Sequence, residues 1–206
     1  MTANEYLALL AEQIHTVIAA TADQDGLPVT CAVDILYADE NGLYFITPKD
    51  KALCQRLTDS AFIALTGIKG SEPLQTASLS LRGKVKNIGA DMLPLLFEQN
   101  PYLSKICPTP ESRKGLTVFQ IYEGTGEWCD LSKKPFERDS FTFGKAEQTG
   151  GGFTVTEDCI GCGTCTSECP QGCIELADDR AVINSESCLQ CGCCADACPV
   201  GAIVSK

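Results

Sequence analysis

The strongest constraint on this chain is a cysteine motif that occurs twice near its C-terminal end. The first copy places cysteines at positions 159, 162, 165 and 169 and a proline at 170, and the second copy repeats this spacing 29 residues later. The segments after the prolines also match, since Gln171–Ile174 aligns with Val200–Ile203. An internal repeat of this kind indicates two copies of one structural unit.

Cysteines at every third position can surround one face of a cubic iron–sulfur cluster when the backbone between them forms a tight loop. The fourth cysteine of each copy then points away and ligates the other cluster. We therefore assign two [4Fe–4S] clusters, the first bound by Cys159, Cys162, Cys165 and Cys198, and the second bound by Cys188, Cys191, Cys194 and Cys169. Cys173 and Cys193 align with Ala202 and Thr164 of the other copy, so we interpret them as packed or spectator thiols.

Zinc ribbons and disulfides are the alternative interpretations of this motif. Zinc sites favour two separated Cys-x-x-Cys pairs and need neither a third step nor a following Cys-Pro pair. The spacing therefore favours iron–sulfur clusters. The stretch from about Phe153 to Lys206 resembles the bacterial-type two-cluster ferredoxins.

The distribution of cysteines predicts the domain organisation. Ten of the fourteen cysteines lie after residue 150, and 206 residues suffice for one ordinary domain and a small one. We predict a domain over residues 1–147, a glycine-rich linker over 148–152 and a ferredoxin domain over 153–206. A segment of about 55 residues buries little apolar surface, so we expect cluster ligation to hold it folded and the cluster-free segment to be disordered.

The charge of the chain is acidic, with a formal net charge of −11. Residues 150–206 carry eight acidic and two basic side chains, which suits docking onto a basic redox partner and disfavours nucleic acid, although the acids could equally serve solubility. The N-terminus has neither a basic nor an apolar leader region, and no run approaches the length of a membrane span. We therefore expect a cytoplasmic protein without membrane contact, in a compartment where thiols stay reduced.

The first 147 residues alternate short strands with short helices. Thr2 and Glu5 form a capping box for a helix over residues 3–14, and His15 at its end receives no role. We predict a three-stranded meander over 16–21, 28–37 and 43–47, further strands over 61–68, 74–87 and 116–128, short helices over 51–57 and 90–97, and a polar surface segment over 132–143. This pattern predicts a mainly β domain, a closed antiparallel barrel, before the small α+β cluster domain.

A second candidate site lies where the strand over 43–47 meets the helix over 51–57. Thr47, Lys49 and Lys51 surround the helix start, where free amide groups, a hydroxyl and ammonium groups can bind phosphate. The alternative interpretation is that these lysines are solvated residues beside a helix start.

This region resembles the pyridoxamine 5′-phosphate oxidase-like family of FMN-binding split barrels. The likeness covers about residues 3–130 and depends on the Asp25-Gly26-x-Pro28 turn, the strand that ends in Thr47, and Lys51 followed by Leu53 and Leu57. It implies that Thr47 and Lys51 bind the FMN phosphate and that the flavin ring lies along neighbouring strands at a homodimer interface.

Other flavin contacts are proposed on the same resemblance. Gln75 and Ser78 lie on the strand that follows Pro73, although Gln75 could equally be a solvent-facing residue. Trp128, the only tryptophan, is expected to cap the barrel core, with a flavin or dimer contact as its second role.

The chain departs from the oxidases at its C-terminal end. The basic and histidine residues with which they bind the substrate phosphate are replaced here by Ser132–Gly144 and the ferredoxin segment. Pyridoxamine phosphate is therefore not the expected substrate. The closer likeness is to fused flavin and ferredoxin proteins of anaerobes.

A chain with both cofactors is suited to convert between one-electron and two-electron reactions. The leading hypothesis is an FMN-dependent oxidoreductase whose clusters relay electrons between a redox partner and a small organic acceptor. Two alternatives remain, an electron carrier whose barrel is a docking module and a redox or flavin sensor. The sequence shows no acid–base dyad or nucleophile–histidine pair, and Cys31, Cys54, Cys107 and Cys129 are interpreted as core or free thiols.

Overall fold

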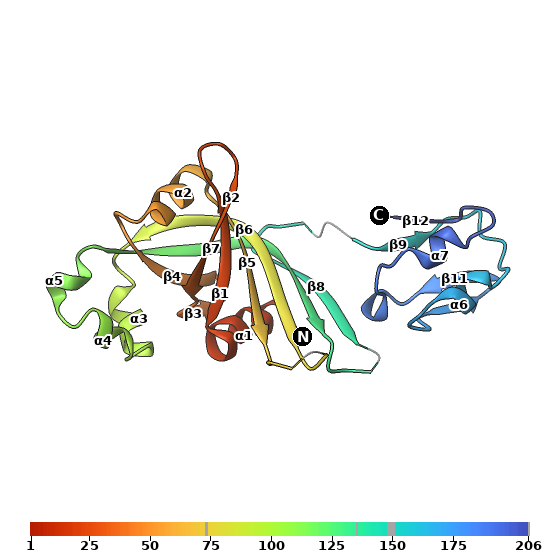
Figure 1. Cartoon of the computed structure of the whole chain (residues 1–206), viewed down its shortest axis with the longest axis horizontal. Coiled ribbons are helices and arrows are strands. Elements are labelled where there is room, and N and C mark those ends of the chain that lie inside the picture. The colour runs from red at the N-terminus through yellow and green to blue at the C-terminus, as the bar shows by residue number, and fades with distance from the viewer. Residues whose placement is uncertain (73, 135, 148–150, 206) are drawn as a thin grey trace. The chain divides into compact units, whose positions relative to one another are not determined.

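A computed structural model describes residues 1–72, 74–134, 136–147 and 151–205 (Figure 1). Its contacts divide the chain into two compact units, Met1–Trp128 with Ser140–Gln148, and Cys129–Asp139 with Thr149–Lys206. Most of the predicted linker, residues 148–150, lies outside the described residues. The domain boundaries therefore stay predictions.

The larger unit is built on one eight-stranded antiparallel sheet. Its strand order is β2-β1-β5-β6-β7-β4-β3, and β8 pairs with β7. The strands are β1 (Thr16–Ala22), β2 (Pro28–Asp34), β3 (Tyr37–Asp39), β4 (Gly42–Pro48), β5 (Phe62–Lys69), β6 (Ala77–Gly89), β7 (Leu116–Asp130) and β8 (Glu137–Phe143). The mainly β character that the sequence predicts is confirmed.

The sheet closes because its two edge strands, β2 and β3, are consecutive in the chain. Only Ile35 and Leu36 separate them, and the backbone amide of Ile35 donates to His15 beside β1 while that of Leu36 donates to Tyr44 on β4. The chain thus crosses from one edge of the sheet to the other within two residues. The prediction of a three-stranded meander with one strand over 28–37 is therefore wrong, because β2 pairs with β1 and β3 pairs with β4.

The predicted N-terminal helix is confirmed and closes one side of the barrel core. It begins as α1 (Ala3–Leu9), with the Thr2–Glu5 capping box formed, and continues as a π-helical turn over Leu10–Ile14. His15 ends it with a positive φ of 59°. The apolar side of this helix packs on inward-facing residues of the sheet such as Phe45, Phe119 and Ile121, all fully buried.

Three short helices follow β6, and the first two cover the other face of β4 and β7. They are α3 (Leu93–Gln99), α4 (Leu103–Ile106) and α5 (Pro110–Arg113), which lie together at one end of the barrel in Figure 1. Leu93 and Leu96 pack on Tyr44 and Val118 in a second apolar cluster. Pro94 lies in the first turn of α3, where its missing amide proton costs no helical hydrogen bond.

The segment over 132–143 differs from its prediction as a polar surface segment. Most of it forms β8, which pairs with β7 and directs Phe141 and Phe143 into the core. The ring of Phe141 stacks on Tyr6 with centroids 4.7 Å apart. Two phenylalanines separated by one residue lie on the same face of a strand and so predict one, but the charged residues before them favoured a surface segment.

The smaller unit contains two similar halves that exchange strands. The first half comprises β9 (Phe153–Val155), α6 (Thr164–Glu168) and β10 (Ile174–Ala177), and the second comprises β11 (Arg180–Ile183), the 3₁₀ turn Ser185–Ser187, α7 (Cys193–Asp196) and β12 (Ile203–Ser205). β9 pairs with β12 and β10 pairs with β11, so each sheet takes one strand from each half. Among the helices of the described ranges, none is both long enough and apolar enough to cross a membrane.

Candidate functional site

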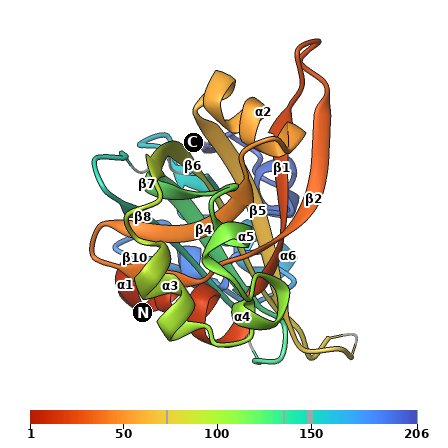
Figure 2. The same ribbon diagram turned by 90° about the vertical axis from the view of Figure 1, so that its left-hand side faces the viewer.

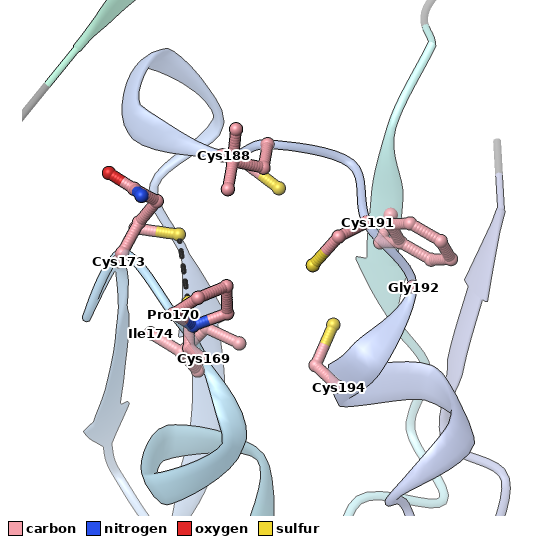
Figure 3. A pocket seen from close by; sticks show the side chains of 11 residues that line it. Cys169, Pro170, Cys173, Ile174, Cys188, Cys191, Gly192 and Cys194 are labelled. Carbon is pink, nitrogen blue, oxygen red and sulfur yellow. Dashed lines mark hydrogen bonds between the residues drawn. The ribbon is translucent and has the colours of Figure 1, made fainter.

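Two cavities in the smaller unit gather the eight cysteines of the motif. The first, with an empty volume of about 310 Å³ counted out to its mouth, is lined by Cys159, Cys162, Cys165 and Cys198. The second, of about 290 Å³, is lined by Cys188, Cys191, Cys194 and Cys169. Each cavity therefore receives three cysteines from one copy of the motif and the fourth from the other. Figure 3 shows the sulfurs of Cys188, Cys191 and Cys194 directed into the second cavity.

The loops that place the first three cysteines follow from glycines at equivalent positions. Gly163 precedes α6 with φ of 77° and Gly192 precedes α7 with φ of 83°, a left-handed conformation that glycine adopts without steric cost. This turn reverses the chain within one cysteine spacing, so both cysteines that flank it can face the same cavity. The same backbone recurs 29 residues apart, which extends the sequence repeat to the conformation of the chain.

The donor set of these cavities fits iron–sulfur clusters. Four motif thiols line each cavity, together with apolar side chains such as Ile160, Leu176 and Leu189. Within the described ranges, no three His, Cys, Asp or Glu side chains are grouped so that they could hold a single metal ion. Four cysteines around one cavity are the donor set of a [4Fe–4S] cluster.

Hydrogen bonds prepare several of these sulfurs to carry negative charge. The backbone amides of Ala181, Gln190 and Ala202 donate to Cys159, Cys188 and Cys198 at 3.5, 3.4 and 3.2 Å. An amide directed at a sulfur would stabilise the charge of that sulfur when it is bound to iron.

Burial and hydrogen bonding move the cysteine pKa values in opposite directions. Burial raises the pKa of Cys165 and of Cys194. A hydrogen bond with the Thr164 side chain, 3.5 Å away, lowers the pKa of Cys162. Iron binding must therefore supply the free energy that removes the protons of the buried thiols.

The residues of the predicted phosphate site lie at the junction of β4 and α2 (Ala52–Ser60). Thr47 is 2% exposed and lies on the same face of β4 as the core residue Phe45. Its Oγ1 is buried and has no hydrogen-bond partner among the described residues. Lys51 is the exposed N-cap of α2, and no side chain caps this helix. Lys49 differs, because its Nζ donates to the carbonyl oxygen of Lys114 at 2.9 Å.

Helix α2 is fixed against the neighbouring strand as well as by its own apolar face. Leu53 and Leu57 are buried in the barrel core, and Arg56 Nε donates to Thr21 Oγ1 on β1 at 2.7 Å. Figure 2 shows α2 beside β1. The junction is therefore held by the sheet on one side and by the core on the other.

The other predicted flavin contacts lie away from this junction within one chain. Gln75 is exposed in the turn before β6, so its prediction as a strand residue is wrong. Ser78 is half-buried near the start of β6. Asn87 lies about 30 Å further along the same strand and accepts a hydrogen bond from Thr117, the residue that pairs with Thr47. Trp128 is 9% exposed in the barrel core, 6.0 Å from the ring of Tyr6, as its core interpretation predicts.

Cys173, which the sequence predicts to be a packed or spectator thiol, is packed, and its place at the second cavity is what sequence reasoning missed. It lines the second cavity, is 8% exposed, and has its Sγ 3.4 Å from that of Cys169. Burial and the neighbouring Cys169 raise its pKa to about 12. Its position four residues after a motif cysteine was the available signal. The repeat alignment concealed this signal because the equivalent residue is alanine.

Comparison with known proteins defines the class of each unit. Residues 158–202 match the family model described as a 4Fe-4S dicluster domain. No curated protein matches the chain in sequence. The C-terminal segment is thus a small iron–sulfur domain of the ferredoxin type, and it indicates a role in redox or electron-transfer chemistry.

The N-terminal unit has the fold of known split barrels. A NimC/NimA family protein from Clostridium acetobutylicum superposes with a TM-score of 0.57 at 15% identity, over 69% of this chain and 95% of that one. A heme-binding protein from Mycobacterium smegmatis gives 0.53 at 15% identity, over 69% and 58%. A pyridoxine phosphate oxidase family protein from C. acetobutylicum, related to general stress protein 26 of Bacillus subtilis, gives 0.51 at 18% identity, over 67% and 94%. The predicted split-barrel fold is therefore confirmed.

Proposed function

We propose that this chain binds two [4Fe–4S] clusters and one FMN, passes electrons between them, and reduces a small organic acceptor. The observation that carries the proposal is the pair of cavities, each lined by four motif cysteines, on a chain whose other unit is a split barrel. The cytoplasm, where thiols stay reduced, is the compartment we propose.

The cysteines would hold the clusters and set their surroundings. Cys159, Cys162, Cys165 and Cys198 are the ligands proposed for the first cluster, and Cys188, Cys191, Cys194 and Cys169 are those proposed for the second. Apolar side chains of both cavities would lie against the clusters, and the backbone amides directed at the sulfurs would offset the negative charge of the thiolates.

The junction of β4 and α2 would hold the FMN phosphate. The unpartnered Oγ1 of Thr47 supports this assignment, because a buried hydroxyl without a partner costs free energy unless a ligand satisfies it. Lys51 would supply positive charge at the uncapped start of α2. Lys49 would position the loop, because its Nζ is bonded to the backbone of the segment before β7.

We also propose a homodimer formed through the outward face of β1 and β5. Ile18, Phe62 and Ile68 are 54%, 45% and 63% exposed on this face, and the small residues Ala20 and Ala64 lie opposite each other between the two strands. An apolar sheet face with small residues at its centre allows close approach of a second sheet.

Ser78 belongs to the same outward face. It pairs with Ile68 across β5 and β6 and alternates with buried residues along its strand. A flavin contact by Ser78 would therefore be made at the dimer interface, whereas Thr47 faces inward.

Together the cofactors would couple one-electron and two-electron chemistry. FMN, when bound, accepts electrons singly and delivers them as a pair. The acidic cluster domain would dock onto a basic redox partner. The role of the protein side chains is then to bind, orient and shield, and the cofactors supply the reactivity.

The cofactor content tests this proposal. Protein purified without oxygen is expected to contain eight iron atoms per FMN, with paramagnetic resonance signals of reduced [4Fe–4S] clusters. Thr47→Val and Lys51→Ala should lower the flavin content and leave the iron content unchanged. The matched control is Lys105→Ala, which removes an exposed lysine on α4. Zinc in place of iron, or flavin content unaffected by either variant, would refute the assignment.

A turnover assay separates an enzyme from a carrier. The reduced holoprotein is mixed without oxygen with quinones, nitro compounds and enoates, and flavin reoxidation is followed by absorbance. Multiple turnovers with one class identify the acceptor. Reoxidation by a redox protein alone would identify a carrier.

A further inference from the structure

The second cluster cavity contains a fifth thiol, which is buried and has no counterpart in the first cavity. Cys173 lines this cavity beside Cys169 and Cys188, and the two sulfurs of Cys173 and Cys169 lie 3.4 Å apart. Figure 3 shows this contact at the wall of the cavity, with the sulfur of Cys173 directed at Cys169. At 8% exposure, Cys173 has little access to water that could compete for the contact.

The internal repeat supplies a comparison within the same molecule. The equivalent of Cys173 is Ala202, which is fully buried and has no side-chain donor. Both positions give their backbone amide to the fourth motif cysteine, as Ala202 does to Cys198 at 3.2 Å. The two sites therefore share the amide donor and differ in the side-chain donor.

Thr164 and Cys193 are another pair of equivalent positions with different residues, but here both cavities have a side-chain donor. Thr164 lies 3.5 Å from the sulfur of Cys162, and its equivalent Cys193 makes a side-chain hydrogen bond with Cys191. A protic side chain thus accompanies the second cysteine of each motif. Of these two pairs, only Cys173 and Ala202 give one cavity a side-chain donor that the other cavity lacks.

The direction of the hydrogen bond follows from the chemistry of the partner. A cysteine bound to iron has lost its proton, so Cys169 can only accept, and the thiol of Cys173 must donate. Hydrogen bonds to the sulfurs of an iron–sulfur cluster favour its more negatively charged, reduced form and raise its reduction potential.

We propose that Cys173 is a non-ligand hydrogen-bond donor to Cys169 that gives the second cluster a higher reduction potential than the first. An electron shared by the two clusters then resides mainly on the second. This inference rests on the proposed binding of two clusters. It adds a role for a residue outside the eight ligands.

The test is a redox titration of the full-length holoprotein followed by low-temperature paramagnetic resonance. Cys173→Ala should lower the potential of the second cluster alone, so that its share of the electron falls about tenfold relative to the first. Ala202→Cys should raise the potential of the first cluster. Cys173→Ser, which keeps a donor, should restore most of the difference.

Each alternative outcome contradicts a specific part of the reasoning. Unchanged potentials in Cys173→Ala, or an equal shift of both clusters, would overturn the proposed donor. A loss of iron from this variant would also overturn it, because Cys173 would then be a ligand. Iron content of the unmodified protein is measured first. Fewer than two clusters there would refute the proposed function instead of this inference.

Discussion

Replacing Thr47 by valine is expected to stabilise the flavin-free protein while weakening flavin binding. The side chain is 2% exposed, and its hydroxyl oxygen has no hydrogen-bond partner among the described residues. Valine keeps nearly the same shape and removes the unsatisfied group. The substitution is therefore expected to change the stability of the barrel and its affinity for FMN in opposite directions.

The expected magnitude follows from the cost of the unsatisfied group. A buried polar group without a partner costs about 1–3 kcal/mol, so Thr47→Val should raise the free energy of unfolding by about that amount. For a protein of this size, each kcal/mol raises the melting temperature by about 2–4 °C. In the presence of FMN the gain should shrink, because the unmodified protein then satisfies its hydroxyl with the ligand.

The matched control lies on the neighbouring strand. Thr117 pairs with Thr47 in the register of β4 and β7 and is also 2% exposed. Its hydroxyl donates to Asn87 Oδ1 at 2.7 Å, so Thr117→Val should destabilise the protein by about 1 kcal/mol or more. Thermal unfolding with and without FMN, followed by circular dichroism, measures both variants. If Thr47→Val destabilises the flavin-free protein as Thr117→Val does, the hydroxyl has a partner and the reasoning fails.

Three further predictions concern other parts of the chain. Gly161→Ala should reduce iron retention, because an added Cβ would lie 2.4 Å from a backbone oxygen of the β10–β11 turn. Gly172→Ala is the control, since Gly172 has a similar positive φ of 60° but no atom within 4 Å of an added Cβ, so this variant should retain more iron in an iron analysis after gel filtration. Burial and the Asp34 carboxylate raise the pKa of Tyr102 to about 12 from 10.0, so the stability that this shift contributes is present below pH 10 and lost as the pH rises through 12. Urea titrations of Tyr102→Phe should therefore show a weaker loss of stability between pH 10 and 12, and an unchanged slope would contradict this. Removing iron with a chelator should accelerate amide hydrogen exchange over residues 153–205 and leave the barrel protected; exchange that stays slow over those residues would show that the domain folds without clusters.

Local patterns predicted the elements that short-range forces decide. The capping box of Thr2 and Glu5 placed the first helix correctly, because its hydrogen bonds join residues three positions apart. The segment over 132–143 was predicted incorrectly, because its two phenylalanines are directed into the core only once the segment pairs with β7. Gln75 was placed on a strand that begins two residues later, a boundary that the pairing of β5 and β6 sets.

The sequence by itself determined which cysteines could form each set of four, since a repeated covalent spacing allows little freedom in how short loops reach a cavity. Only the tertiary structure decided how the barrel closes, because the strands between its edges β2 and β3 pair across long stretches of chain, as β4 does with β7. It also directed Thr47 inward without a partner and brought Cys173 against Cys169. Such relations depend on which surfaces pack together, and packing is set by the whole fold rather than by neighbouring residues.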